Sequence, residues 1–312
     1  MQKVKSKNKV TKKSSKTSLN GNGSNASKRL QVLKTYKLYI NGKFERSESG
    51  RYIKVKNEEG KVSANICRAS RKDFRNTVVA ARKAQSGWQG RTAYNRGQIL
   101  YRMAEMLEDR RDQFVNQLIE QGQTHATAVN EVGASIERLV YYAGWCDKYQ
   151  QIFSSVNPVA SSYFNFSFPE PTGVVVSFAP AKFSLLGLVS SIAPALVGGN
   201  SVICFGSENY HITTSTFAEI LNDSDVPAGS VNLLTAKHSE VIKWVATHMD
   251  VNAIMYLDDN KELIKILQQN ISSNVKRLIT DSRKDWSKEE AQNPYFILDT
   301  QEIKTTWHPV GN

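Results

Sequence analysis

The chain has 312 residues, and its 41 Lys and Arg against 29 Asp and Glu give a formal net charge of +12. The excess is confined to one end, because Met1–Phe44 holds eleven Lys, one Arg and no acidic residue. The 29 basic residues that remain are balanced by the 29 acidic ones, so the rest of the chain is formally neutral. A neutral body argues against a basic nucleic-acid-binding fold, which needs surplus positive charge to follow phosphates.

A hydrophobic share of 40% and a charged share of 22% are typical of a globular protein. No apolar run reaches the roughly 18 residues of a membrane helix, since even Leu185–Val197 is interrupted by Pro194. The N-terminus lacks the apolar core of a secretory signal. The widely spaced Cys67, Cys146 and Cys204 suit a reducing compartment, so we expect a cytoplasmic protein without disulfides.

The first predicted segment, 1–34, is a disordered Lys-rich tail, because Lys, Ser, Asn and Gly cannot bury enough apolar surface to fold. A solubilising leader, a localisation signal and a contact to an anionic partner all remain open as its role. Any binding to nucleic acid would have to come from this tail.

In the next segment apolar and polar residues first alternate as in a β-strand and then follow helical spacing. Tyr36–Ile40, the turn dipeptide Asn41-Gly42 and Lys43-Phe44 predict a β-hairpin. Apolar residues at helical spacing then predict three helices, of which the first is capped by Ser70 and the third has Val140 on its inner face. These helices are expected over Ser70–Ser86, Thr92–Gln121 and Ala126–Phe153.

The second half predicts an α/β sheet. Tyr163–Phe168 alternates as a strand with one aromatic face. Beyond it, five β-rich runs alternate with four helices, which is typical of a doubly wound parallel sheet that binds ligands at the carboxyl ends of its strands. The expected strands are Gly173–Phe178, Ser201–Phe205, Ser230–Leu234, Val251–Tyr256 and Val275–Ile279. The expected helices are Phe183–Val197, Tyr210–Leu221, His238–Thr247 and Asn260–Asn270.

This order of elements, with four sequence motifs, resembles the N-terminal and cofactor-binding part of the aldehyde dehydrogenase superfamily over about 35–280. The motifs are Pro171-Thr172-Gly173-Val174-Val175, Ile192–Val202, Ser207-Glu208 and Val226–Thr235. The stretches His248–Ile254 and Glu302–Gly311 are similar to the truncated, non-catalytic second domain of family-sixteen aldehyde dehydrogenases and to small bacterial proteins of that type. The resemblance implies that the catalytic domain is missing and that 281–312 is a linker and a C-terminal strand.

Lys182 and Asp281 stand at the positions of two catalytic groups of this superfamily. Lys182 replaces the oxyanion-binding Asn, and a surface lysine without a catalytic role is the alternative. Asp281 is a weak substitute for the general base. The nucleophilic Cys should follow some tens of residues later, but no Cys occurs after 280. The three Cys are expected to be buried small hydrophobes, so we expect no catalytic residue. The five His show no metal-ligand spacing, so we expect no metal site either.

The cofactor motifs are also altered. Phe205 stands where the superfamily has a Lys for the adenosine ribose, whereas Ser207 and Glu208 are retained as candidate cofactor-binding residues. Glu208 could instead favour a helix N-terminus. Asp258 and Asp259 stand where the pyrophosphate loop should be and are expected, with Asn260, to cap a helix. We therefore expect no cofactor, with NAD(P) as the alternative.

The assembly segments of the superfamily are retained at 158–172, which includes Tyr163–Phe168, and at Ile303–Trp307. The leading hypothesis is an inactive subunit or scaffold that assembles with itself or with a full-length aldehyde dehydrogenase through these strands. One alternative is an NAD(P)-dependent oxidoreductase acting on aldehydes, with a nucleophile of its own or one supplied by a partner. A second alternative is binding of an anionic partner through the tail.

Overall fold

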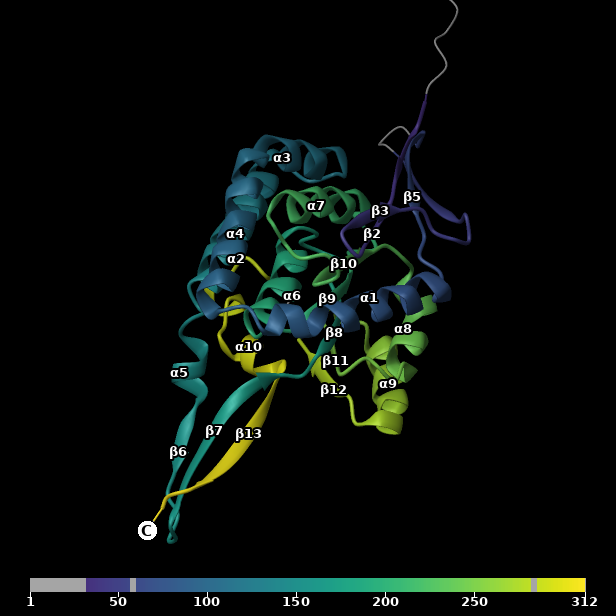
Figure 1. The fold of residues 1–312 in the computed structure, drawn as a ribbon. Coiled ribbons are helices and arrows are strands. Elements are labelled where there is room, and N and C mark those ends of the chain that lie inside the picture. Colours follow the sequence, from purple (N-terminus) through teal and green to yellow (C-terminus); the bar gives the residue numbers. More distant parts are fainter. Residues whose placement is uncertain (1–31, 57–59, 282–284, 312) are drawn as a thin grey trace, which may run out of the picture. The chain divides into compact units, whose positions relative to one another are not determined.

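The core of the computed structural model, which describes residues 32–56, 60–281 and 285–311, is a parallel sheet (Figure 1). Its order is β12-β11-β8-β9-β10, and neighbouring strands are parallel. All residues of the four strands from β8 to β11 are buried, as expected when both faces of a sheet are covered. The predicted doubly wound α/β fold is confirmed. The strands are β8 (Val174–Phe178), β9 (Ser201–Phe205), β10 (Val231–Leu234), β11 (Ala253–Tyr256) and β12 (Arg277–Thr280).

The predicted hairpin extends this sheet rather than standing apart from it. β2 (Leu38–Ile40) pairs antiparallel with β10 and with β3 (Lys43–Glu45). Asn41 and Gly42 have φ values of 52° and 72°, which a type I′ turn requires of both central residues. The sheet is therefore mixed. The hairpin also covers the edge of β10, which a purely parallel sheet would leave unpaired.

Helices cover both faces of the sheet. The helices α2, α3, α4, α6 and α7 contribute to one apolar cluster, whereas α1, α8 and α9 contribute to a second cluster on the opposite face. Their bounds are α1 (Arg71–Gln89), α2 (Ala93–Asp109), α3 (Arg111–Glu120), α4 (His125–Ala143), α6 (Leu186–Val197), α7 (His211–Asp223), α8 (His238–Thr247) and α9 (Lys261–Asn270), which a 3-10 turn, η1 (Ile271–Asn274), follows.

Two of the predicted helices are shorter than expected. The helix expected over Thr92–Gln121 breaks at Arg110, whose guanidinium pairs with Glu219 and Asp223 of α7. The helix expected to reach Phe153 ends at Gly144, and α5 (Tyr149–Phe153) follows as a separate turn. Val140, predicted to face inward, is 43% exposed. The spacing of apolar residues alone predicted neither break.

The sequence reasoning did not anticipate a small sheet before α1. It comprises β1 (Lys34–Tyr36), β4 (Tyr52–Lys56) and β5 (Val62–Cys67), in the order β1-β5-β4. The alternation of Ile53 and Val55 with lysines was a readable signal for β4. Most of the predicted tail lies outside the described residues, and Lys34 already belongs to β1.

A third sheet, β13-β7-β6, contains both predicted assembly segments (Figure 1). β7 (Tyr163–Pro171) includes Tyr163–Phe168, and the rings of Phe164, Phe166 and Phe168 follow one another at 5.4 and 5.7 Å. β6 spans Ser155–Asn157 and β13 spans Gln301–Pro309. The C-terminal strand was expected to pair with a neighbouring molecule. It pairs along its length with β7 of the same chain on one side and is an outer strand of its sheet, so pairing with a neighbouring molecule through the other side stays a prediction.

The described part of the segment between β12 and β13 packs against the helices. It contains the short helical turns η2 (Glu289–Ala291) and α10 (Tyr295–Asp299). Trp286, Ala291 and Ile297 are buried. The buried Arg138 of α4 donates to the carbonyls of Trp286 and Ala291 at 2.9 and 3.1 Å. The segment predicted as a linker is thus fixed to α4 where the structure describes it.

Candidate ligand-binding edge of the sheet

The loops after β8 and β9 meet at the carboxyl edge of the sheet, where an open α/β fold binds its ligands. The Ser207 hydroxyl donates to the Ala181 carbonyl at 2.8 Å, and the Asn209 side chain donates to the same oxygen at 3.3 Å. Ser207 is buried, so its hydroxyl is used in holding the two loops together. Lys182 is exposed beside this contact.

Glu208 reaches the N-terminus of α8. Its Oε1 accepts a hydrogen bond of 2.7 Å from the backbone N–H of His238, the first residue of that helix. A carboxylate at this position satisfies a free donor and interacts favourably with the helix dipole. The sequence predicted a contact with the helix that follows Glu208, α7, whereas the carboxylate contacts the next helix, α8.

Phe205 points away from this edge into the core. Its ring stacks on Phe178 at 5.0 Å with an interplanar angle of 10°, and it also contacts Phe74. The side chain is fully buried. It therefore offers no polar group at the position where the resemblance implies a Lys.

Two buried histidines lie next to Glu208, and the sequence reasoning considered them only as metal ligands. His238 Nε2 lies 3.1 Å from the Gly206 carbonyl, and the imidazole stands edge-on to Phe178. Burial lowers the pKa of His238, while Glu208 opposes the shift. Burial also lowers the pKa of His211 to about 4. Both rings are consequently neutral at pH 7. In the sequence, the only sign of these two residues was a His a few positions after a predicted strand, β9 for His211 and β10 for His238.

The loop after β11 is acidic. Asn260 is the cap of α9, with its side-chain oxygen 3.1 and 3.2 Å from two backbone N–H groups, whereas Asp258 accepts from the N–H of Asp259. The prediction of a cap is thus confirmed for Asn260 and wrong for Asp258. Burial raises the pKa of Tyr256, and the charges of Asp258, Glu208 and Asp259 raise it further. The negative charges of these three carboxylates therefore all act on the same side chain, Tyr256.

Asp281 continues the ladder of β12, since its N–H donates to the Tyr256 carbonyl at 3.2 Å. Its charge acts on Asp299, whose pKa is raised mainly by burial. Asp281 is thereby placed beside the segment that leads into β13. None of the described residues forms a cluster of three or more His, Cys, Asp or Glu side chains that could hold a metal ion.

All three thiols are buried and free. Burial raises the pKa of Cys146 to about 12 and that of Cys204 to about 11. A thiolate is the nucleophilic form of Cys, so neither side chain is activated at neutral pH.

The fold and this edge define an open α/β unit of the dinucleotide-binding type, and comparison with known proteins identifies it further. The model of the aldehyde dehydrogenase family matches residues 44–283, so the chain belongs to that family. It is 28% identical over 249 residues to the putative aldehyde dehydrogenase DhaS of Bacillus subtilis, covering 78% of this chain and 50% of the relative. It is 30% identical over 284 residues to retinal dehydrogenase 2 of Gallus gallus, covering 85% and 54%. The chain thus spans about half the length of these relatives.

Solved structures agree on the fold. The NAD+ complex of aldehyde dehydrogenase from Bacillus cereus matches with a TM-score of 0.75 and 24% identity, over 79% of this chain and 50% of that one. PnpE in complex with nicotinamide adenine dinucleotide matches with a TM-score of 0.75 and 25% identity, over 79% and 50%. Among the helices that the structure describes, none is both long and apolar enough to cross a membrane.

Proposed function

We propose that this protein is a non-catalytic member of the aldehyde dehydrogenase family that acts by assembly, with itself or with a full-length aldehyde dehydrogenase. The observation that carries the proposal is the β6–β7–β13 sheet. Tyr163, Ile303 and Trp307 on one of its faces are 45%, 54% and 57% exposed, and Phe164 and Val156 on the other are 46% and 68% exposed. Large exposed apolar side chains concentrated on one small sheet are typical of an interaction surface.

The open edge of β13 adds backbone groups to this surface. β13 is an outer strand of its sheet and runs over nine residues, Gln301–Pro309. An unpaired edge of this length can add a strand from another chain. Lys304, which is paired with Glu170 of β7, is placed along it and would disfavour indiscriminate pairing. A selective partner is therefore expected rather than open-ended stacking.

The site chemistry supports a non-catalytic role. The two buried thiols with raised pKa values are not activated nucleophiles. Glu208 already accepts the N–H of His238, and Asp258 and Asp259 add negative charge to the same edge. A diphosphate needs open N–H groups and positive potential at such an edge. The residues at this edge therefore do not fit the diphosphate of a dinucleotide.

We infer a cytoplasmic location, which the three free thiols of this chain support.

Replacing Ile303 and Trp307 by Lys tests the assembly role. Burying an unpaired charge costs on the order of several kcal/mol per ion, so the double variant should be monomeric where the wild type is not. Sedimentation velocity at micromolar concentration, alone and with a catalytic aldehyde dehydrogenase, measures this. The matched control is Tyr52→Lys with Tyr94→Lys, two exposed aromatic residues outside the surface. A wild type that stays monomeric in both settings contradicts the proposal.

A further inference from the structure

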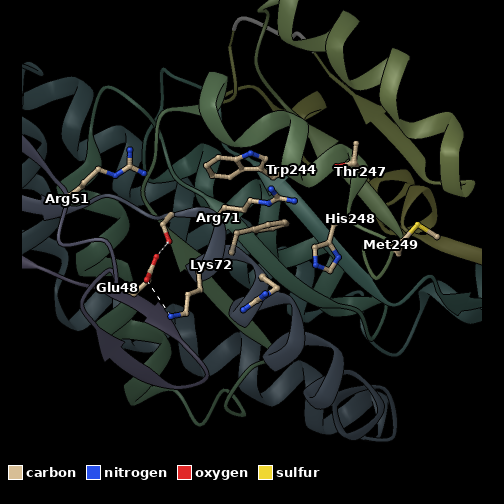
Figure 2. Close-up of a pocket in the computed structure, with 11 residues that line it drawn as sticks. Glu48, Arg51, Arg71, Lys72, Trp244, Thr247, His248 and Met249 are labelled. Carbon is tan, nitrogen blue, oxygen red and sulfur yellow. Dashed lines mark hydrogen bonds and ion pairs between the residues drawn. The ribbon is translucent and has the colours of Figure 1, made fainter.

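A cavity of about 800 Å³ lies between α1 and α8 (Figure 2). The start of α1 and residues 48–51 form one side, and the last turn of α8 with the residues after it forms the other. Its volume falls within the range of small-molecule sites. It is lined by Glu48, Arg51, Ser70, Arg71, Lys72, Phe74, Arg75, Trp244, Thr247, His248 and Met249.

The cavity carries a surplus of positive charge. Arg71 and Arg75 are one turn apart on α1, so their guanidinium groups lie on the same face of the helix. Arg51 joins them from the loop, and among the described residues none of these three forms an ion pair. Lys72 lies 3.5 Å from Glu48, the only carboxylate among the lining residues.

The two carboxylates beside the start of α1, Glu48 and Asp73, are already used within the protein. Glu48 accepts from the Ser70 hydroxyl at 2.9 Å in addition to its contact with Lys72. Asp73 accepts from the Ser47 hydroxyl at 2.6 Å and from the Ser70 N–H at 2.8 Å, which completes the capping box of α1. The three arginines are therefore not neutralised from within, and the positive end of a 19-residue helix adds to their potential.

Both walls of the cavity also contribute aromatic rings, Phe74 from α1 and Trp244 from α8. Trp244 is half-buried, and Phe74 is buried with its ring edge-on to His248 at 5.6 Å. Burial lowers the pKa of His248, so its ring is mostly neutral at pH 7. Figure 2 shows Arg71 beside Trp244 and His248 on the side of Met249. An indole next to unpaired guanidinium groups provides a flat apolar surface and anion donors within one cavity.

We propose that this cavity binds a nucleoside phosphate, with the phosphates on Arg71 and Arg75 and the base against Trp244. Guanidinium groups match phosphate oxygens with two parallel hydrogen bonds, and indole rings stack on bases. The site is distinct from the edge bearing Glu208. Glu208 contacts His238, the first residue of α8, whereas the cavity is lined by Trp244 and the residues that end and follow this helix, and six residues of helix place Trp244 about 9 Å further along the axis.

Calorimetric titration of the full chain with ADP tests the proposal. Pyrophosphate probes the phosphate-binding part of the cavity, and adenosine probes the base-binding part. We expect saturable ADP binding that weakens at least tenfold in Arg71→Gln with Arg75→Gln and severalfold in Trp244→Leu. Pyrophosphate should bind more weakly than ADP, and adenosine more weakly still. The matched control is Lys83→Gln with Arg102→Gln, which removes the same charge from exposed positions outside the cavity.

Three results would overturn the site. They are no saturable ADP binding at millimolar concentration, equal loss in the control variant, and loss in Glu208→Gln but not in the arginine variant. Pyrophosphate binding as tightly as ADP would overturn the role of Trp244. None of these results bears on assembly through β13, so the two proposals fail separately.

Discussion

The histidines beside Glu208 have pKa values that differ between the folded and unfolded chain. His211 is buried, its Nδ1 has no hydrogen-bond partner among the described residues, and its folded pKa is about 4 against an ordinary value of 6.5. Glu208 favours its charged form and His238 opposes it, but burial outweighs both. Between these two pKa values the unfolded chain binds the extra proton. Stability is therefore full above about pH 6.5 and falls as the pH falls toward 4.

We expect His211→Gln to reduce this acid sensitivity. The wild type should lose on the order of 3 kcal/mol through His211 between pH 6.5 and 4, and the variant should lose correspondingly less. Part of the slope should remain, because the pKa of His238 is lowered in the same direction. Urea unfolding at several pH values measures the effect. Identical pH slopes in the two proteins would show that His211 is not protected in the fold.

At the scale of elements, the helical periods and the alternating strands were predictable from sequence, whereas their partners were not. Ser70 and Asn260 were recognised as caps because a cap acts within three residues. Arg110, at the break between α2 and α3, pairs with Glu219 and Asp223, more than a hundred residues away. The pairing of β13 with β7 also joins segments distant in sequence, so no local pattern could reveal it.

Arg138 joins two such distant elements and gives a prediction at this scale. Arg138→Met should leave the carbonyls of Trp286 and Ala291 and the Ser190 hydroxyl without their guanidinium donor. We expect a loss of about 3 kcal/mol and faster hydrogen exchange in 285–300. Urea unfolding and exchange measured by mass spectrometry report the two effects. Arg102→Met, an exposed arginine on α2, should change stability by less than about 0.5 kcal/mol; unchanged exchange in the Arg138 variant would contradict its anchoring role.

At the scale of the whole molecule, the chain spans about half the length of its aldehyde dehydrogenase relatives. Relatives such as the Bacillus cereus enzyme have been solved with NAD+. In this chain the charges of Glu208, Asp258 and Asp259 at the sheet edge all act on Tyr256 and raise its pKa, after burial. Like charges at this edge oppose a diphosphate.

We therefore expect no saturable NAD+ binding at this edge in a titration up to millimolar concentration. The cavity lined by Arg71 and Arg75 could itself bind a dinucleotide, so the titration is run in the Arg71→Gln, Arg75→Gln background. Tight, saturable binding there that disappears in Glu208→Gln would contradict the non-catalytic proposal and favour an NAD-dependent oxidoreductase.

The sequence by itself determined the α/β class, the family resemblance, the type I′ turn and the local caps, because each depends on residues that are close together or on a repeating period. The tertiary structure decided what those residues do. In the fold, Glu208 contacts the N-terminus of α8, the ring of Phe205 lies in the core, and β13 pairs with β7. It also gathered the three arginines around Trp244. These relations depend on long-range packing, which fixes side-chain direction and neighbours only once the sheet and its helices have come together.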